Sequence, residues 1–320
     1  MKEALAVISK ELEIFEQKFK NAVETDVPLL DKIMKYIIKR KGKQMRPMFV
    51  LLSAKLYGEV NDATYRAAAL VELLHTATLV HDDVVDESFE RRGFFSINAI
   101  WKNKIAVLVG DYMLSKGLLL STTNNDFEQL RILSNAVKMM SEGELLQLEK
   151  SRSLNLDENV YYEIIRTKTA SLLASACAAG AFSTTENTTE LEKMQAFGEK
   201  VGMAFQIKDD IMDYGSQKIG KPTGNDIKEK KLTLPLIYTI NKLGRNNAAD
   251  IINILKNKNK DDAKVQYVIT KVIQNGGIAY AEQKMEAFRD EALDILNSFP
   301  PTETKHALEQ LVRFTTDRKY

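Results

Sequence analysis

Apolar residues along the chain recur at intervals of three and four, the spacing of one face of an α-helix. Near the start this interval joins Leu5, Ile8, Leu12, Phe15 and Phe19. Longer segments of the same character, with few or no Gly or Pro residues and many good helix formers, cover residues 62–86, 157–180 and 190–214. Strand-like alternation is scarce, and no repeat of roughly 20–50 residues stands out. The pattern predicts an all-α protein.

The predicted helices are separated by short breaks. These fall at Gly42, Gly58, Gly93 and residues 122–126, 183–189 and 215–225. None is long enough, or rich enough in Pro and Ser, for an interdomain linker, so we expect one domain over residues 1–320. The last break combines glycines, a proline and two lysines, and we interpret it as a mobile loop that closes over a site.

Two segments carry the candidate chemistry. Residues 81–87 read HDDVVDE and residues 206–213 read QIKDDIMD, so both contain Asp-Asp-x-x-Asp. Because positions i and i+4 are neighbours on a helix, Asp82 pairs with Asp86 and Asp209 with Asp213. Asp83 and Asp210 supply a third carboxylate to each cluster. Carboxylates crowded among apolar residues are costly unless a cation neutralises them.

Magnesium suits these clusters, because Mg²⁺ prefers oxygen ligands and commonly bridges to substrate phosphates. A single acidic motif is more often a solvated face, but two copies of one spacing weaken that alternative. An EF-hand is excluded, since the loop glycine and the terminal Glu spacing are missing. His75 lies two helical turns before Asp82, and Gln206 lies three residues before Asp209, so each shares the face of its cluster.

Cationic residues are interleaved with the acidic motifs. Lys43 and Arg46 stand just before Pro47, which favours a helix start where backbone N–H groups also face an anion. Arginine forks suit phosphate oxygens, and two arginines follow the first acidic cluster. The complete basic set is Lys43, Arg46, Arg91, Arg92, Lys168 and Lys221. Each alone is typical of a solvated charge, but their order indicates a site that grips diphosphate.

Taken together, these motifs resemble the trans-isoprenyl diphosphate (polyprenyl) synthase family from about residue 41 to residue 235. The chain departs from the family pattern at Lys41, where a Gly is usual, and at Phe94 and Phe95 after Arg-Arg-Gly. The matching stretches are GKQMRP at 42–47, HDDVVD at 81–86, RRG at 91–93, VGDY at 109–112, GELLQ at 143–147, KT at 168–169, FQIKDDIMD at 205–213 and the segment from GK at 220–221 to TLP at 233–235.

The resemblance implies an isoprenoid synthase fold, a homodimer of chains with ten or more helices around a central substrate cavity. It implies Mg²⁺, with three ions in the substrate complex, and two substrates: isopentenyl diphosphate and an allylic diphosphate. The implied metal ligands are Asp82, Asp83, Asp86, Asp209, Asp210 and Asp213. Around the allylic diphosphate it implies Arg91, Lys168, Thr169, Gln206 and Lys221, and around isopentenyl diphosphate Lys43, Arg46, His75 and Arg92.

The implied reaction lengthens the allylic chain by head-to-tail condensation. Release of diphosphate leaves an allylic cation that the double bond of isopentenyl diphosphate attacks, and the released diphosphate then accepts the proton. One and two turns before Asp82 lie Thr78 and Leu74, and the resemblance adds Ala77. Relatives that stop early carry bulky aromatics in this region. The small Ala77 and Thr78 therefore predict an open tunnel and a medium- to long-chain product, such as a heptaprenyl or octaprenyl diphosphate.

The composition bears on nucleic-acid binding, disulfide bonds and membrane insertion. Lys and Arg total 45 and Asp and Glu 44, so nothing indicates a nucleic-acid surface. The single Cys177 excludes an internal disulfide and, among small residues, is expected to be a buried thiol. The N-terminal apolar run breaks too early for a signal peptide, and no stretch approaches the ~18–20 apolar residues of a membrane span. We expect a cytoplasmic protein; loose membrane association during product release stays an open alternative.

Four alternatives stay open. A shorter-chain (farnesyl or geranylgeranyl) diphosphate synthase would catalyse the same condensation but would not have the predicted open tunnel. A class I terpene cyclase would not need a second diphosphate pocket. A non-catalytic partner subunit of a heteromeric synthase tends to lose an aspartate motif, whereas this chain keeps both. A plain helical scaffold would leave the ordered motifs unexplained.

Overall fold

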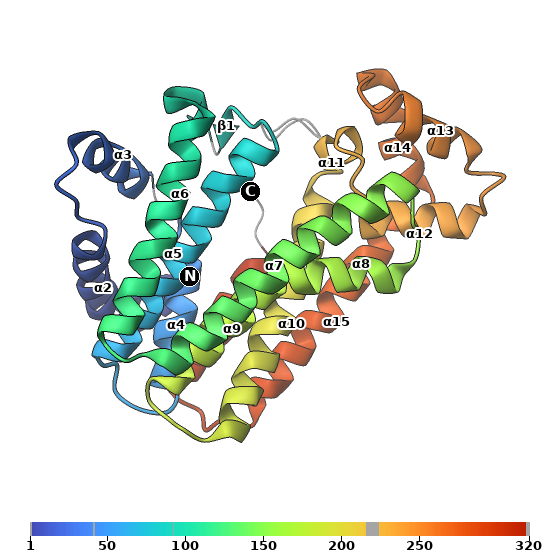
Figure 1. Cartoon of the computed structure of the whole chain (residues 1–320). Helices are drawn as coiled ribbons and strands as arrows, with labels where there is room; N and C mark the ends of the chain where they lie inside the picture. The colour runs from blue at the N-terminus through green and yellow to red at the C-terminus, as the bar shows by residue number, and fades with distance from the viewer. Residues whose placement is uncertain (1, 41, 92, 216–223, 318–320) are drawn as a thin grey trace. The chain divides into compact units, whose positions relative to one another are not determined.

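The computed structural model describes residues 2–40, 42–91, 93–215 and 224–317, without the side chains of residues 2, 3 and 91. Its described part is helical, with one two-stranded antiparallel hairpin. The elements are α1 Lys2–Val7, α2 Ser9–Ala22, α3 Pro28–Lys39, α4 Met45–Lys55, α5 Asp62–Val85, β1 Glu90–Arg91, β2 Phe94–Phe95, α6 Ile97–Thr123, α7 Phe127–Ser153, α8 Glu158–Ile165, the π-helical turn η1 Arg166–Ala170, α9 Ser171–Phe182, α10 Thr188–Met212, α11 Asn225–Lys228, α12 Leu234–Leu243, α13 Ala249–Asn257, α14 Asp262–Gln274, α15 Gly277–Asn297 and α16 Glu303–Asp317 (Figure 1).

The all-α prediction is confirmed, and the predicted helices are found with small changes. The first apolar segment divides at Ile8 into α1 and α2, and Ile8, Phe15 and Phe19 are buried as expected. The segment 62–86 is α5, and the segment 190–214 is α10. The segment 157–180 is interrupted by η1. This π-helical turn contains one residue more than an α-helical turn.

The chain divides into two compact units. Unit 1 consists of residues 1–137, 175–195 and 301–308, and unit 2 consists of residues 138–174, 196–300 and 309–320. The single domain expected from the short breaks stays a prediction. The first acidic motif lies in unit 1 and the second in unit 2.

In unit 1 the long helices α5 and α6 lie side by side and are joined through the β1–β2 hairpin (Figure 1). Helix α5 begins at a capping box, in which Asn61 and Thr64 bond each other's backbone N–H groups. It buries an almost continuous stripe of small and branched residues, including Ala67, Leu70 and Leu73. Burial of this kind stabilises a helix more than its intrinsic propensity does.

Helix α6 is the one described helix that is long and apolar enough to cross a membrane by length and composition. Such a stretch was not expected from the sequence. Its packing accounts for its character as well, because Ala106, Val109 and Met113 are buried on the side that meets α5. The opposite side exposes apolar residues, with Leu108 55% and Leu119 60% exposed.

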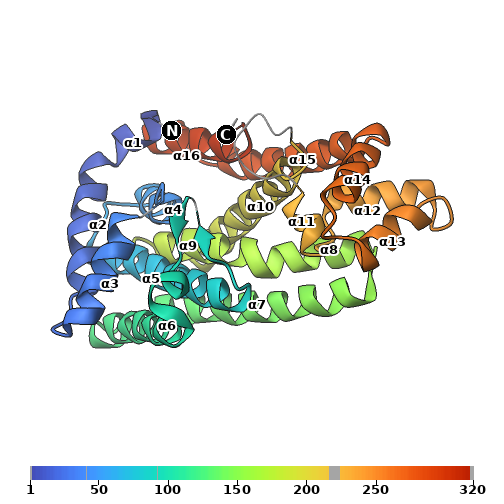
Figure 2. The same ribbon diagram turned by 90° about the horizontal axis from the view of Figure 1, so that it is seen from above.

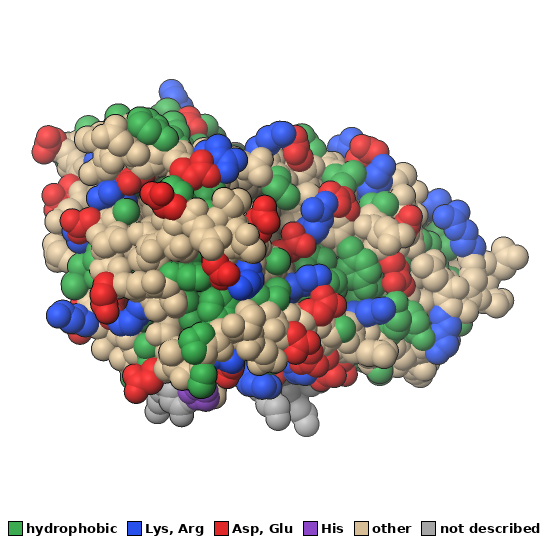
Figure 3. Space-filling view, turned by 90° about the horizontal axis from the view of Figure 1, so that it is seen from below, with side chains coloured by type: hydrophobic (Ala, Val, Ile, Leu, Met, Phe, Trp, Pro, Cys, Tyr) green, Lys and Arg blue, Asp and Glu red, His purple; other side chains and the backbone are tan. Residues whose placement is uncertain are grey.

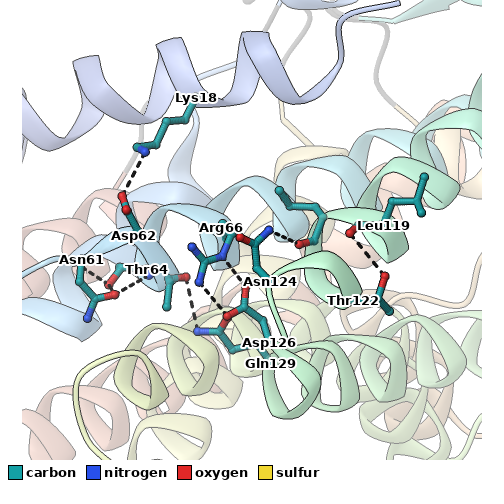
Figure 4. A network of polar contacts seen from close by, with 12 residues as sticks. Lys18, Asn61, Asp62, Thr64, Arg66, Leu119, Thr122, Asn124, Asp126 and Gln129 are labelled. Carbon is teal, nitrogen blue, oxygen red and sulfur yellow. Dashed lines mark hydrogen bonds and ion pairs between the residues drawn. The ribbon is translucent and has the colours of Figure 1, made fainter.

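A polar network fastens the start of α5 to the turn between α6 and α7 (Figure 4). The Arg66 guanidinium donates from Nη2 to Asp126 Oδ1 at 2.9 Å and from Nε to Oδ2 at 2.5 Å, a two-pronged pair. Gln129 Nε2 donates to the Ala63 carbonyl at 3.4 Å. At the edge of the network Lys18 pairs with Asp62 at 3.0 Å, with both side chains largely exposed.

We expect Arg66→Ala to lower the free energy of unfolding by about 2 kcal/mol, because it leaves a mostly buried Asp126 carboxylate without its cation. Lys18→Ala is the matched control and should cost less than ~0.5 kcal/mol, since an exposed pair contributes little. Urea unfolding of both variants measures the difference. Equal losses would show that burial of the Arg66 pair contributes nothing extra.

Unit 2 is built around α10, α12 and α15, with α8, α13 and α14 packed nearby (Figure 2). One buried cluster joins Ile240, Leu255 and Val268 from α12, α13 and α14. A second joins Tyr161 and Ile165 of α8 to Ile207 of α10. These two clusters hold the helices that carry the second acidic motif and the Lys-Thr pair.

Two predictions from composition can be compared with the structure. Cys177 in α9 is fully buried, and this burial raises the pKa of its thiol to about 12, so the buried-thiol interpretation is confirmed. On the face drawn in Figure 3, Lys and Arg side chains lie among Asp and Glu side chains, as the near-zero net charge leads one to expect.

Candidate functional site

The first acidic motif occupies the last turn of α5. Asp82 is partly exposed, Asp83 is buried, and Asp86 is the exposed residue that ends the helix. The Asp86 N–H donates to the Asp82 carbonyl at 2.8 Å, so the two residues are one helical turn apart as the spacing predicts. Asn98 Nδ2 holds the Asp83 carbonyl at 3.0 Å. The motif thus presents Asp82 and Asp86 outward and uses Asp83 inward.

Two residues expected near isopentenyl diphosphate touch each other. Arg46, in the first turn of α4, approaches His75 of α5, with Nη1 2.8 Å from Nε2. Because a guanidinium keeps its protons, Arg46 is the donor and His75 Nε2 the acceptor of this contact. Pro47 lies in the first helical turn, and Lys43 is exposed just before it.

The structure explains the VGDY segment, to which the sequence analysis gave no role. A Cβ on Gly110 would lie 2.1 Å from His81 Nε2, so only glycine leaves room for this imidazole. His81 Nε2 lies 3.2 Å from the Val107 carbonyl and 3.6 Å from Asp111 Oδ1. Gly110 therefore lets His81, the residue before the first aspartate, rest directly on α6.

Arg91 lies on β1, and its backbone pairs with Phe94 across the hairpin that follows the first motif. Arg92 and Lys221 lie outside the described residues, as do residues 216–223 of the loop predicted to be mobile. In α5, Ala77 is fully buried and Thr78 partly buried, with its hydroxyl donating to the His75 carbonyl at 2.8 Å.

The second acidic motif lies at the end of α10, and the burial and contacts of its three aspartates differ from those of the first motif. Asp209 is exposed. Asp210 is buried, and its two carboxylate oxygens accept from Tyr161 at 2.7 Å and from Gln206 at 2.8 Å. Asp213 accepts from the backbone N–H groups of Asn225 at 3.1 Å and Asp226 at 3.0 Å, which ties the end of α10 to the start of α11.

The Lys-Thr pair lies on η1, beside the second motif. Lys168 Nζ forms an ion pair with Glu144 of α7 and lies 3.4 Å from Gln147 Oε1. Thr169 donates to Gln206 Oε1 at 2.9 Å. In a π-turn the Ser171 N–H bonds to the carbonyl five residues back, at Arg166, and such turns are frequent at functional sites. The structure therefore brings Thr169 and Gln206 into contact, while the Lys168 side chain contacts α7.

Two glycines allow the close approach of helices to η1. A Cβ on Gly143 of α7 would lie 2.4 Å from Thr167 Oγ1 and 2.8 Å from the Lys168 backbone nitrogen. A Cβ on Gly202 of α10, one turn before Gln206, would lie 2.5 Å from the Ala170 Cα. Both contacts are shorter than real Cβ atoms tolerate, so these positions require glycine.

Burial dominates the electrostatics around the second motif. It raises the pKa of Asp210 to about 7 and that of Asp226 to about 8, with neighbouring carboxylates as a further cause, and it also raises the pKa of Asp213. For Asp210 and Asp226 the folded pKa lies above the unfolded one. The free energy of unfolding therefore decreases as the pH rises from about 4 toward these values, because the buried groups ionise less readily than in the unfolded chain. A nearby cation would offset that cost.

The donor chemistry fits Mg²⁺, because Asp82, Asp86 and Asp209 are outward-facing residues with oxygen ligands only. Within the described ranges no group of three or more His, Cys, Asp or Glu side chains is close enough to hold a metal ion alone. Substrate phosphates commonly complete the shell of a protein-bound Mg²⁺. Asp210 and Asp213 already use their carboxylate oxygens as acceptors within the protein.

Sequence reasoning missed Tyr161, Glu144 and the reason for Gly143. Tyr161 stands in an ordinary helical pattern, eight residues before Thr169, and nothing local marks it as a partner of Asp210. Glu144 belongs to the GELLQ segment that carried the resemblance, but its pairing with Lys168 depends on the packing of α7 against η1. The segment itself was the available signal.

Comparison with known proteins finds relatives over almost the whole chain. The sequence pattern of the family described as Polyprenyl synthetase matches residues 27–272. The chain is 31% identical to heptaprenyl diphosphate synthase component 2 of Bacillus subtilis, covering 100% of this chain and 91% of the relative. It is 33% identical to octaprenyl diphosphate synthase of Escherichia coli, covering 92% of each protein.

Solved structures of similar sequence also have a similar fold. A polyprenyl synthase from Caulobacter crescentus, complexed with calcium and isoprenyl diphosphate, has a TM-score of 0.92 and 33% identity, covering 100% of this chain and 98% of that one. A geranylgeranyl pyrophosphate synthase from Bacteroides thetaiotaomicron has a TM-score of 0.84 and 37% identity, covering 99% and 98%. The predicted isoprenoid synthase fold is confirmed.

Proposed function

The chain belongs to the polyprenyl synthetase family and is a prenyltransferase, and we propose that it condenses isopentenyl diphosphate with an allylic diphosphate, head to tail, in a Mg²⁺-dependent reaction. The observation that carries the proposal is that a cationic residue lies beside the helix of each acidic motif. In unit 1 Arg46 bonds His75, which stands two turns before Asp82 on α5. In unit 2 Lys168 is next to Thr169, which bonds Gln206 on the helix of Asp209.

Asp82, Asp86 and Asp209 would hold the metal, with three ions in the substrate complex, and bound Mg²⁺ supplies neutralisation of the diphosphate charge. Lys168, with Arg91 and Lys221, would bind the allylic diphosphate, and Thr169 and Gln206 would orient it. Lys43, Arg46, His75 and Arg92 would bind isopentenyl diphosphate, with the Arg46 fork on its phosphate oxygens.

In the reaction the allylic carbon–oxygen bond breaks and the double bond of isopentenyl diphosphate forms the new carbon–carbon bond. The proton that is then lost goes to the released diphosphate, which lies next to it. The residues' task is to hold the two diphosphates so that the reacting carbons meet, and to keep water away from the cation.

The direct test incubates the purified chain with isopentenyl diphosphate, farnesyl diphosphate and Mg²⁺ and sizes the dephosphorylated products by mass spectrometry. A ladder that ends beyond geranylgeraniol supports a medium- or long-chain synthase active without a partner. No consumption of isopentenyl diphosphate would overturn the proposal. That result would favour a cyclase or a non-catalytic subunit, an alternative suggested by the Bacillus subtilis relative being called component 2.

The shorter-chain alternative is favoured by the likeness to a geranylgeranyl pyrophosphate synthase. The small side chain at Ala77 favours the longer product. We expect Ala77→Val, Ala77→Leu and Ala77→Phe to shorten the product in that order, because each larger side chain would block more of the tunnel. Product length by mass spectrometry and the melting temperature are measured together. Unchanged length, or lost stability alone, would mean that Ala77, which is fully buried, only packs the core.

We also propose that the chain forms a homodimer through the outer face of α6. Val107, Leu108, Leu118 and Leu119 are between 41% and 60% exposed and fall on one side of the helix after its kink at Lys102. Leu108→Glu combined with Leu119→Glu should convert a dimer to a monomer in light scattering, because it places charge in an apolar contact. Ile273→Glu, at an exposed apolar position of α14, is the control and should remain dimeric.

A further inference from the structure

A chain of four hydrogen-bonded side chains runs through unit 2, from the buried Tyr161 to Thr169 on η1. Tyr161 bonds Asp210 at 2.7 Å, Asp210 bonds Gln206 at 2.8 Å, and Gln206 bonds Thr169 at 2.9 Å. Resting on the proposed function, we infer that Tyr161 is a positioning residue for the allylic site. It acts through Asp210 and Gln206 and touches no substrate itself, since it is 4% exposed.

The hydrogen bonds of the four groups converge on Asp210. The Tyr161 hydroxyl donates to Asp210 Oδ2, and Gln206 Nε2 donates to Asp210 Oδ1. The amide nitrogen of Gln206 therefore faces Asp210. Its carbonyl oxygen then faces Thr169, and the Thr169 hydroxyl donates to it. The hydroxyl hydrogen of Thr169 is therefore already bonded to Gln206 before any substrate binds.

The direction matters because an amide can turn over and exchange its oxygen and nitrogen. With Tyr161 in place, each Asp210 oxygen has its own donor and the carboxylate cannot rotate without breaking a bond. Without the phenol, one oxygen loses its donor and the carboxylate can turn. Gln206 Nε2 then no longer has an acceptor at a fixed position. Thr169 and Gln206 lose the fixed dipoles that a preorganised site needs.

The surrounding packing leaves the orientation of the amide to Asp210, which Tyr161 holds in place. Gly202 brings η1 against α10 so closely that Thr169 and Gln206 are held within bonding distance. The backbone thus fixes where the two side chains are, but not which way the amide points. The contact with Asp210, whose other oxygen Tyr161 holds, distinguishes the two amide orientations.

The neighbouring Tyr162 provides a matched control. It stands on the same helix, and its ring contacts those of Tyr161 and Phe288. Its hydroxyl is buried without a hydrogen-bond partner among the residues that the structure describes. Tyr161→Phe and Tyr162→Phe therefore remove the same atom from adjacent positions, and only the first removes a bond of the network.

The test measures kcat and KM of the full-length chain with farnesyl diphosphate, isopentenyl diphosphate and saturating Mg²⁺, well below the melting temperature. We expect Tyr161→Phe to lower kcat by about 10- to 100-fold, the usual effect of removing a residue that orients a site, with KM changed by less than about threefold. Tyr162→Phe should keep the wild-type kcat. In the background of Gln206→Leu, Tyr161→Phe should have no further effect on kcat, since its route to Thr169 is already cut.

Three outcomes overturn the inference. One is a Tyr161→Phe variant as active as Tyr162→Phe. Another is an undiminished loss in the Gln206→Leu background, which indicates a structural role independent of Gln206. In the third, the wild-type chain consumes no isopentenyl diphosphate, and the proposed function falls together with the inference. In the first two the wild-type turns over normally, so they overturn the inference alone.

Discussion

Replacing Asp209 with asparagine should lower kcat by about 10³-fold and raise the Mg²⁺ concentration needed for half-maximal rate. The substitution removes a charged oxygen ligand, and groups that stabilise developing charge contribute factors of about this size. Asp209 is exposed, so the loss should come without unfolding. Asp82→Asn, in the other motif, should have a similar effect. The measurement is the rate of isopentenyl diphosphate consumption as Mg²⁺ is titrated.

Asp250→Asn is the control for this prediction, because Asp250 is another exposed aspartate of unit 2, in the first turn of α13. It should leave both the rate and the Mg²⁺ dependence unchanged. Retention of wild-type activity by both motif variants would exclude the proposed metal ligands. Loss of the melting transition would instead assign the aspartates a structural role.

Gly143→Ala is expected to lower kcat by about 10²-fold and the free energy of unfolding by about 2 kcal/mol. The added Cβ would lie 2.8 Å from the Lys168 backbone nitrogen, so α7 or η1 must move. Overpacking of this kind usually costs about 1–3 kcal/mol, and a shift of a catalytic group by about 1 Å costs activity separately. Activity assays and urea unfolding of the same preparation separate the two effects.

Gly58→Ala is the matched control, because its Cβ would meet Thr184 at an ordinary 3.5 Å. Combining Gly143→Ala with Thr167→Ala should restore part of the stability, since it removes the hydroxyl oxygen 2.4 Å from the new carbon. If Gly143→Ala behaves like Gly58→Ala, the tight packing of α7 on η1 is not needed for activity.

The sequence predicted those parts of the candidate site that depend on spacing within one helix. Asp82 and Asp86 are one turn apart because four residues make about a turn, wherever the helix packs. Gln206 and Asp210 follow the same rule and bond each other directly. The long helices were predictable for the same reason, since their apolar periodicity is local.

The parts that sequence reasoning missed depend on contacts between distant segments. Tyr161 meets Asp210 across 49 residues, and Lys168 meets Glu144 through the packing of α7 on η1. No local pattern distinguishes Tyr161, which is bonded, from Tyr162, whose hydroxyl has no described partner. The division of roles within the second motif was equally hidden, because burial sets it: Asp209 faces outward and Asp210 inward.

The π-turn η1 determines whether the protein can tolerate the deletion of one residue in this segment. One extra residue rotates everything before it by about 100° relative to everything after it. Deletion of a single residue between Arg166 and Ala170 would produce an uninterrupted α-helix with better backbone bonds. It would also turn Tyr161 away from Asp210 while leaving Gln206 in place. In this segment a deletion that improves the helix is expected to break the bond between Tyr161 and Asp210, so the number of residues matters here independently of their identity.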